Sequence, residues 1–362
     1  MTEISREAIE KILSSIIDPH TNEDLATSMT IKDISVDGDS VSVRIVLGYP
    51  AGPYIETLTT EIQQRLSEEG ISDAKLDVSY KVQAHKVQND LTPLENVKNI
   101  IAIASGKGGV GKSTTTVNLA LALQQQGATV GILDADIYGP SQPRMMGLSG
   151  RPESEDGKLL EPMVNYDIQT MSIGFLIEED TPMIWRGPMV TQALQQLLTN
   201  TNWKDLDYLL IDMPPGTGDI ALTLAQQVPV SGAVIVTTPQ DIALLDARKG
   251  LKMFEKVDVP VLGILENMSV HICSECNHEE PIFGTGGGQK MADEYKVDML
   301  GAMPLDIRIR RETDEGKPTV VADPDSRISE IYRETARNMV GRLSVTARNM
   351  NAAFPNIVIQ NT

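Results

Sequence analysis

The first 82 residues combine helical and alternating patterns, which predicts a small α+β domain. Apolar residues recur every three or four positions over 9–17 and 55–66, as on the buried face of a helix. Apolar and mostly polar residues alternate over 41–47 and 76–82, as in half-buried strands. We expect Asp18-Pro19 to end the first helix.

The pattern changes after a polar stretch at 83–97, which contains Pro93 and which we interpret as a linker. From residue 98, short apolar runs alternate with helical stretches. Strands buried on both faces have this character, and they predict an α/β fold with a mainly parallel sheet covered by helices. The weak pattern after residue 345 supports no assignment for the tail 346–362. The predicted strands are Ile100–Ala104, Val130–Leu133, Tyr208–Ile211, Ala233–Val236 and Val261–Leu265.

Net charge and composition disfavour several classes of binding partner. The chain has 362 residues and a formal net charge of −19, which disfavours non-specific binding to nucleic acid or an anionic membrane. No apolar run is long enough for a transmembrane helix. Because the first ten residues carry three glutamates and no basic segment before an apolar one, we expect a cytoplasmic protein.

The strongest motif is a phosphate-binding loop between the strand at 100–104 and a helix predicted from Thr114 to Gln126. It fits G-x-x-x-x-G-K-[ST] in full. We expect its backbone N–H groups to surround phosphates, Lys112 to reach the β- and γ-phosphates of ATP, and Ser113 to bind Mg²⁺. Lys107 is either a solvated loop residue or a charge that acts on the nucleotide of a second subunit. The loop is Gly106, Lys107, Gly108, Gly109, Val110, Gly111, Lys112, Ser113, with Thr114 after it.

Carboxylates follow two of the predicted strands. Asp134 and Asp136 come after 130–133, and Asp212 after 208–211. Ligands of open parallel sheets lie beyond the carboxyl ends of the strands, so these side chains are expected near the phosphates. We predict that Asp212 holds Mg²⁺, that Asp134 assists at the metal, and that Asp136 orients or activates the attacking water.

These motifs together resemble a known family. The loop is similar to the deviant Walker A motif of MinD, ParA and nitrogenase iron proteins. Within that class the chain resembles the Mrp/ApbC iron–sulfur cluster carriers over nearly all of 98–340. The segments that carry this resemblance are Asp134–Ser141, Trp185–Met189, Asp212–Asp219, Glu266–Ser269, Ile282–Gly284 and Asp314–Pro318.

Pattern and resemblance together give domains at 1–82 and 98–345. The resemblance implies a homodimer that encloses ATP with Lys107 acting across the interface. It also implies a role for Asn267 in recognising adenine, and transfer of iron–sulfur clusters from donor proteins to apoproteins. Residues 5–82 resemble an iron–sulfur assembly domain, in which a Pro-Ala-Cys-Pro turn is usual. Here Gly52 replaces that cysteine, so we treat the domain as a docking or structural module.

Cys273 and Cys276 are the only two cysteines of the chain. Their spacing suits zinc or iron–sulfur ligation. One chain has too few thiolates for an all-cysteine [4Fe–4S] cluster, but a symmetric dimer supplies four. Because His271 and His278 flank the pair, a Cys₂His₂ zinc site within one chain is the local alternative. A redox disulfide is a third possibility.

We therefore expect an ATPase that carries a [4Fe–4S] cluster on Cys273 and Cys276 of two subunits. A positioning ATPase of the MinD/ParA kind is an alternative, although it needs a basic DNA surface or an amphipathic membrane helix. The other alternative is an ATPase with a structural zinc site.

Overall fold

The computed structural model describes residues 5–38, 40–88, 91–155, 157–177, 187–273, 275–276 and 278–353, without side chains beyond 346. Two compact units emerge. Unit 1 comprises Met1–His85 together with Val340–Thr362, and unit 2 comprises Lys86–Met339. Unit 1 thus includes residues from both ends of the sequence.

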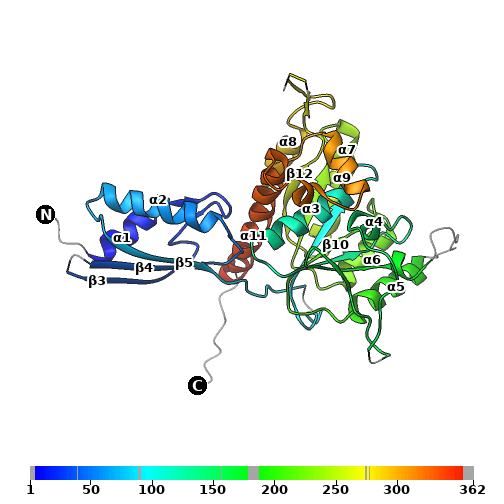
Figure 1. The fold of residues 1–362 in the computed structure, drawn as a ribbon, viewed down its shortest axis with the longest axis horizontal. Helices are drawn as coiled ribbons and strands as arrows, with labels where there is room; N and C mark the ends of the chain where they lie inside the picture. Colours follow the sequence, from blue (N-terminus) through cyan, green and yellow to red (C-terminus); the bar gives the residue numbers. More distant parts are fainter. Residues whose placement is uncertain are drawn as a thin grey trace. The chain divides into compact units, whose positions relative to one another are not determined.

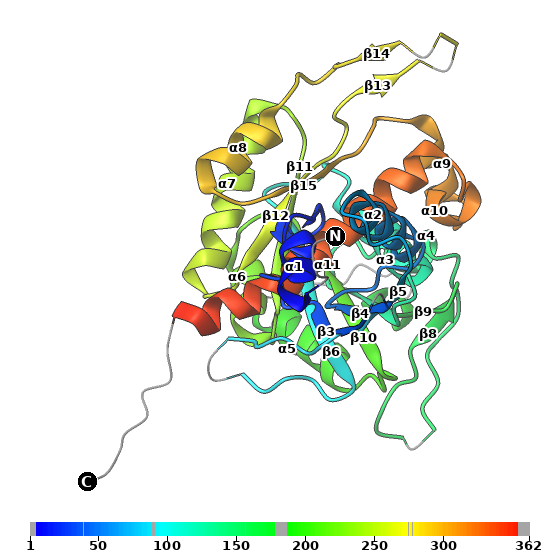
Figure 2. The same cartoon turned by 90° about the vertical axis from the view of Figure 1, so that its left-hand side faces the viewer.

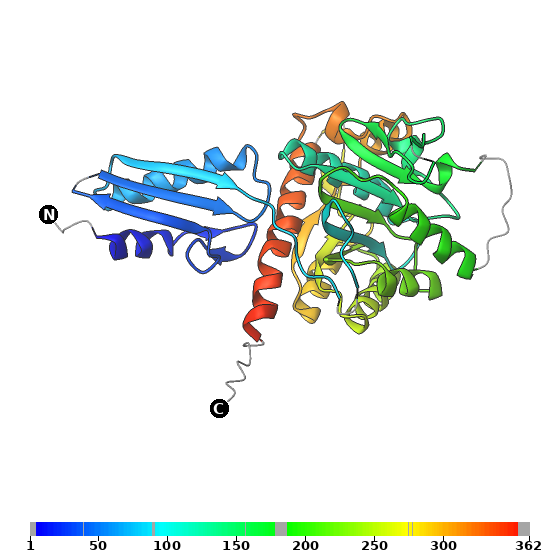
Figure 3. The same ribbon diagram turned by 90° about the horizontal axis from the view of Figure 1, so that it is seen from below.

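Unit 1 contains a three-stranded sheet with the order β3-β4-β5 (Figure 3). Helices α1 and α2 contact each other and the sheet, and every second residue of β4, from Val41 to Leu47, is apolar and buried, whereas the residues between them are more exposed. The predicted α+β pattern is therefore present. Its elements are α1 (Arg6–Leu13), β1 (Ile17–Asp18), β2 (Glu23–Asp24), β3 (Ile31–Asp37), β4 (Ser40–Leu47), α2 (Tyr54–Glu68) and β5 (Ala74–Tyr80).

The first helix is shorter than predicted. It ends at Leu13, because the Ser14 and Ser15 hydroxyls donate to the carbonyls of Lys11 and Ile12, which satisfies carbonyls of the last turn. Ile17, which we assigned to the buried face of the helix, is 56% exposed and pairs with Asp24 in a short bridge.

Unit 2 has an eight-stranded sheet with the order β15-β12-β11-β6-β10-β7-β9-β8, parallel except for the edge strand β8 (Figure 1). All five predicted strands lie in it. Its strands are β6 (Val97–Ser105), β7 (Val130–Asp134), β8 (Met163–Asn165), β9 (Ile168–Ser172), β10 (Leu206–Asp212), β11 (Gly232–Thr237), β12 (Val261–Glu266) and β15 (Met299–Ala302). A separate hairpin joins β13 (His271–Ile272) to β14 (Glu279–Glu280).

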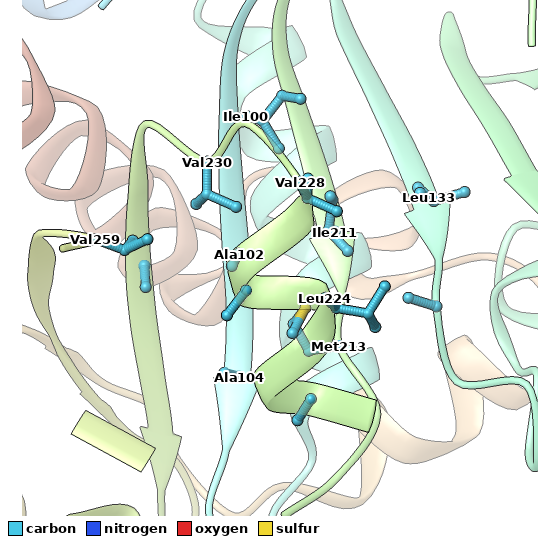
Figure 4. Packing of buried hydrophobic residues seen from close by; sticks show 14 of the residues in the cluster. Ile100, Ala102, Ala104, Leu133, Ile211, Met213, Leu224, Val228, Val230 and Val259 are labelled. Atoms are coloured by element: carbon cyan, nitrogen blue, oxygen red, sulfur yellow. The ribbon is translucent and has the colours of Figure 1, made fainter. Parts of the chain in front are cut away.

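Helices cover the large sheet. Figure 4 shows Leu224 of α6 and Val228, which directly follows that helix, over Ile211 and Met213 and beside Ala102 of the central strand. These contacts belong to the main apolar core, which holds in place the strands whose carboxyl ends carry the site. The helices are α3 (Lys112–Gln125), α4 (Gln142–Met145), α5 (Gly187–Thr199), α6 (Asp219–Gln227), α7 (Asp241–Lys256), α8 (Gly287–Tyr295), α9 (Ile307–Asp314), α10 (Thr319–Ala322) and α11 (Arg327–Ala353), with a 3₁₀ turn at Ile173–Phe175.

Candidate functional site

The glycine-rich loop of the P-loop motif follows the central strand and lies between Ser105 and Lys112, with α3 after it. Gly109 and Gly111 both have φ of +80°, a conformation that glycine adopts without steric cost. A Cβ added at Gly106 would lie 2.0 Å from the carbonyl carbon of Asp246 in α7, so a larger residue would displace that helix. The loop geometry therefore requires glycine at these three motif positions.

Lys112 and Asp212 form a buried ion pair at this loop. Parallel pairing of β10 with β6 brings Asp212, the last residue of β10, to the P-loop. Lys112 Nζ donates to Asp212 Oδ1, and the Thr116 hydroxyl donates to the same oxygen at 3.2 Å. The side chain of Lys112 is 6% exposed and that of Asp212 is fully buried. Removing one partner of such a pair typically costs about 3–5 kcal/mol, because the other charge stays buried.

Gln142, at the start of α4, completes this cluster, and no motif had pointed to it. Its Nε2 donates to Asp212 Oδ2 at 3.0 Å and to the Ser113 carbonyl at 3.1 Å. Gln142 is fully buried, and its Oε1 has no hydrogen-bond partner within the described residues. The side chain thus connects the carboxylate of Asp212 to the P-loop and leaves one acceptor available to a further donor.

Asp134 organises the turn that follows β7. Its Oδ2 accepts from the backbone N–H groups of Ser141 and Gln142, at 3.0 and 3.1 Å, and from the Ser172 hydroxyl at 3.0 Å. Its Oδ1 accepts from the N–H of Asp136 at 3.2 Å. Through these bonds Asp134 fixes the segment that carries Asp136 and Gln142; its role at the metal remains a prediction.

The electrostatics differ between the two aspartates of this turn. Burial and the charge of Asp212 raise the pKa of Asp134 to about 7. Asp136 is only half-buried, and burial raises its pKa too, although the charge of Lys112 acts in the opposite direction. A raised pKa suits a carboxylate that accepts a proton near neutral pH. The role of Asp136 as general base remains a prediction.

The oxygen donors at the P-loop fit a magnesium ion. Mg²⁺ prefers hard oxygen ligands and retains several waters, so one hydroxyl, one carboxylate and substrate phosphates are enough. Ser113 is half-buried at the start of α3, and Asp212 lies at the neighbouring strand end. The chemistry of this donor set therefore suits the metal that accompanies ATP.

Lys107 and Asn267 occupy different positions at the loop. Lys107 is half-buried, and its carbonyl accepts from the Ser105 hydroxyl at 2.9 Å. Asn267 follows β12 and donates through Nδ2 to the Val110 carbonyl at 2.9 Å. A Cβ at Gly111 would lie 2.2 Å from this nitrogen, so Asn267 packs directly on the P-loop. Its role in adenine recognition is not tested by these contacts.

The two cysteines lie in the turn of the β13–β14 hairpin, which projects from the body of unit 2 (Figure 2). Cys273 is partly buried and donates its N–H to the His278 carbonyl at 2.9 Å, whereas Cys276 is exposed. Backbone N–H groups of Glu275 and Cys276 lower the pKa of the Cys273 thiol. Amide donors around a sulfur favour the thiolate, which is the form that binds metal.

The flanking histidines do not join the cysteines in a metal site within the part of the chain described. His271 Nδ1 forms a hydrogen bond with the Leu305 carbonyl at 3.1 Å. Among the described residues, no three side chains of His, Cys, Asp or Glu gather closely enough to hold a metal. Trp185 and Arg186, two residues of the family resemblance, lie outside the described residues, as does most of the tail 346–362. None of the described helices combines the length and apolar character needed to span a bilayer.

Two family profiles match the chain. Residues 96–340 match the family described as "NUBPL iron-transfer P-loop NTPase", and residues 6–72 match "Iron-sulfur cluster assembly protein". Among solved structures, the nucleotide-binding protein of Archaeoglobus fulgidus in complex with ADP is 38% identical, with a TM-score of 0.58, over 66% of this chain and 93% of that one. The cell division ATPase MinD of Pyrococcus furiosus is 23% identical and shares the fold.

Relatives with curated names agree with these profiles. The iron-sulfur cluster carrier protein of Haemophilus influenzae is 51% identical over 94% of this chain and 92% of its own length. That of Escherichia coli K12 is 49% identical over 94% and 93%, respectively. The iron-sulfur cluster transfer protein NUBPL of Mus musculus is 53% identical over 69% of this chain and 79% of its own. With the P-loop site described above, these matches establish that the chain belongs to the family of iron–sulfur cluster carrier P-loop NTPases.

Proposed function

We propose that this chain hydrolyses ATP as a homodimer and carries a [4Fe–4S] cluster bound by Cys273 and Cys276 of both subunits, for delivery to apoproteins. The observation that carries this proposal is that the P-loop and the cysteine hairpin both follow carboxyl ends of strands in one parallel sheet. Nucleotide and cluster would then lie at the same edge of each subunit.

The ATP chemistry follows from charge and position. Lys112 and the N-terminus of α3 would neutralise the phosphates, and Ser113 and Asp212 would hold Mg²⁺, which stabilises charge on the phosphate oxygens. Lys112 would then exchange its contact with Asp212 for one with phosphate. Asp136 would accept the proton of the attacking water, since its raised pKa favours proton uptake.

Exposed apolar side chains support the dimer. Large apolar side chains that are at least 38% exposed follow the carboxyl ends of five strands of the large sheet. A second copy of this chain docked at that edge would cover these side chains. They are Tyr138 after β7, Leu176 after β9, Ile242 and Leu245 after β11, Ile282 after the hairpin that follows β12, and Ile307 after β15.

The ligand count supports a cluster shared between subunits. Each chain offers two thiolates, and the described residues assemble no third ligand beside them. Four cysteine sulfurs are needed for a [4Fe–4S] cluster, so two hairpins must meet. A cluster on an exposed hairpin would be accessible to a recipient protein, which suits transfer.

Anaerobic reconstitution tests the proposal. We expect the purified chain to bind about four irons and four sulfides per dimer, as a [4Fe–4S] cluster requires. Visible thiolate-to-iron absorption should appear, and Cys273→Ser or Cys276→Ser should abolish it. ATP hydrolysis measured in the same samples should persist in both variants. Binding of one zinc per monomer, with no labile sulfide, would reject the carrier mechanism in favour of the zinc alternative.

A further inference from the structure

Glu266, the last residue of β12, holds both ends of the segment that contains the cysteine hairpin. The carboxylate is 3% exposed. Its Oε1 accepts from the Ser269 hydroxyl at 2.7 Å, where the chain leaves the sheet, and its Oε2 accepts from the Gly288 N–H at 2.7 Å, where α8 begins. Residues 270–287 lie between these two contacts. One buried side chain therefore contacts both ends of the segment 270–287.

The neighbouring residue connects the same strand end to the phosphate site. Asn267 donates to the Val110 carbonyl and packs where Gly111 has no Cβ. The N–H of Asn267 also donates to the Thr237 carbonyl at 2.7 Å, which fixes its backbone to β11. Asn267 therefore connects Val110 of the P-loop to the neighbouring residue Glu266 by direct contact.

The residues around Glu266 are closely packed. A Cβ added at Gly288 would lie 3.1 Å from the Cβ and the Oε2 of Glu266, so the start of α8 rests directly on the carboxylate. The Met303 N–H donates to the Glu266 carbonyl at 2.8 Å, and the Ser269 N–H donates to the Met303 carbonyl at 2.9 Å. The segment 270–287 is thus fixed at both ends, whereas Cys276 within it is exposed.

We propose that Glu266 is a positioning residue that couples nucleotide binding at the P-loop to the geometry of the cysteine hairpin. The consequence for cluster binding rests on the function proposed above, whereas the coupling itself does not. A carboxylate that merely caps α8 would add stability without transmitting the nucleotide state, and the two roles predict different results.

Three substitutions separate these roles. Glu266→Met removes both contacts and keeps the side-chain length. Ser269→Ala removes only the contact just before the segment 270–287. Glu266→Gln preserves both contacts, because its carbonyl oxygen can accept from the Gly288 N–H while its amide donates to the Ser269 hydroxyl oxygen. Ser5→Ala, which removes the cap of α1 in unit 1, serves as the matched control.

Hydrogen exchange of the full chain, with and without a non-hydrolysable ATP analogue and Mg²⁺, provides the test. In the wild type and in Glu266→Gln, we expect the analogue to slow exchange both at 106–115 and at 270–287. Glu266→Met and Ser269→Ala should keep the first response and lose the second. In Glu266→Met the Gly288 amide should exchange about tenfold faster, as expected for a lost hydrogen bond to a charged group.

A wild-type response at 270–287 in Glu266→Met, or no response there in the wild type, would overturn the coupling. If Glu266→Met fails to fold, Ser269→Ala and Glu266→Gln decide the question. Release of a reconstituted cluster to an iron chelator is the second measurement: ATP should change its rate in the wild type and not in Ser269→Ala. Failure of the wild type to bind a cluster would reject the proposed function, but the exchange result would remain valid.

Discussion

The phosphate site is assembled from buried side chains on several elements, whereas the two cysteines lie in the turn of a hairpin that has only two bridged residue pairs. At the first, Lys112, Asp212 and Gln142 are nearly or fully inaccessible to water and bond one another. At the second, Cys276 is exposed. A buried hydrogen-bonded network restricts the geometry of its side chains, whereas an exposed thiol is accessible to a partner protein. Changes at the two sites should therefore have separable effects.

Lys112→Ala should give the largest difference between the effects on the phosphate site and on the cysteine site. The substitution removes the charge that meets the phosphates, so ATP hydrolysis should fall to background in a phosphate-release assay. It also leaves Asp212 uncompensated, and the free energy of unfolding should drop by about 3 kcal/mol or more, measured by urea denaturation. Iron and sulfide uptake at the hairpin should persist at a temperature where the variant is folded. Loss of uptake by a folded variant would mean that the two sites are not separable.

Lys107→Ala tests whether the two lysines of the P-loop have different roles. If Lys107 acts across the dimer, the variant should bind ATP within about twofold of the wild type, yet turn over roughly a thousandfold more slowly. Fluorescent-nucleotide titration and steady-state hydrolysis measure the two quantities. Mixing this variant with an excess of Lys112→Ala chains should restore part of the activity, because each mixed dimer has one complete site. Unchanged turnover in Lys107→Ala would defeat the cross-dimer role.

A smaller effect is expected at Gln142, whose amide joins Asp212 to the P-loop. Gln142→Met keeps the length but loses a hydrogen bond to a charged group, which should cost about 2 kcal/mol of stability. Gln195→Met is the matched control, since Gln195 donates to Gln227 at 2.7 Å on the exposed surface. The control should change the unfolding free energy by less than about 0.5 kcal/mol. Equal effects in the two variants would show that the buried network adds nothing.

The smallest effect is a pH dependence of stability at Asp134. Because its folded-state pKa is raised to about 7, the folded protein binds a proton more tightly than the unfolded chain. Stability should then fall as the pH rises from about 4 to about 7, and this contribution should be constant above that range. Urea midpoints at pH 6, 7 and 8 measure it. The stability of the wild type relative to Asp134→Asn should increase toward pH 6, and no such increase would refute the raised pKa.

The parts of the fold that sequence patterns predicted are those with strong local periodicity. The five buried strands were continuous apolar runs, and each lies in the large sheet. Strand β9 was missed because Thr170 and Ser172 interrupt its apolar pattern, and both are fully buried. Ser172 occupies the core because its hydroxyl donates to Asp134, 38 residues away. A polar residue buried for such a contact cannot be recognised from its neighbours in sequence.

The same limit applies to the site. The P-loop and its lysine form one motif of fixed spacing, and Asp212 directly follows a continuous apolar run, so local patterns identified these residues, which the structure brings together. Gln142 bonds Asp212 across 70 positions, and Glu266 bonds Gly288 across 22. These partners are brought together by strand order, which no local pattern specifies. The helix expected over 9–17 is present, but its end was misplaced for a different reason, since two serine hydroxyls bond the carbonyls of the last turn and end the helix at Leu13.

Unit 1 is discontinuous, since it joins Met1–His85 to Val340–Thr362. Val340 and Leu343 are buried, and a Cβ at Gly341 would lie 2.4 Å from the carbonyl oxygen of His20. Because translation reaches Gly341 only after the whole of unit 2, its packing against His20 forms late in synthesis. A polypeptide that stops before residue 340 would lack this packing.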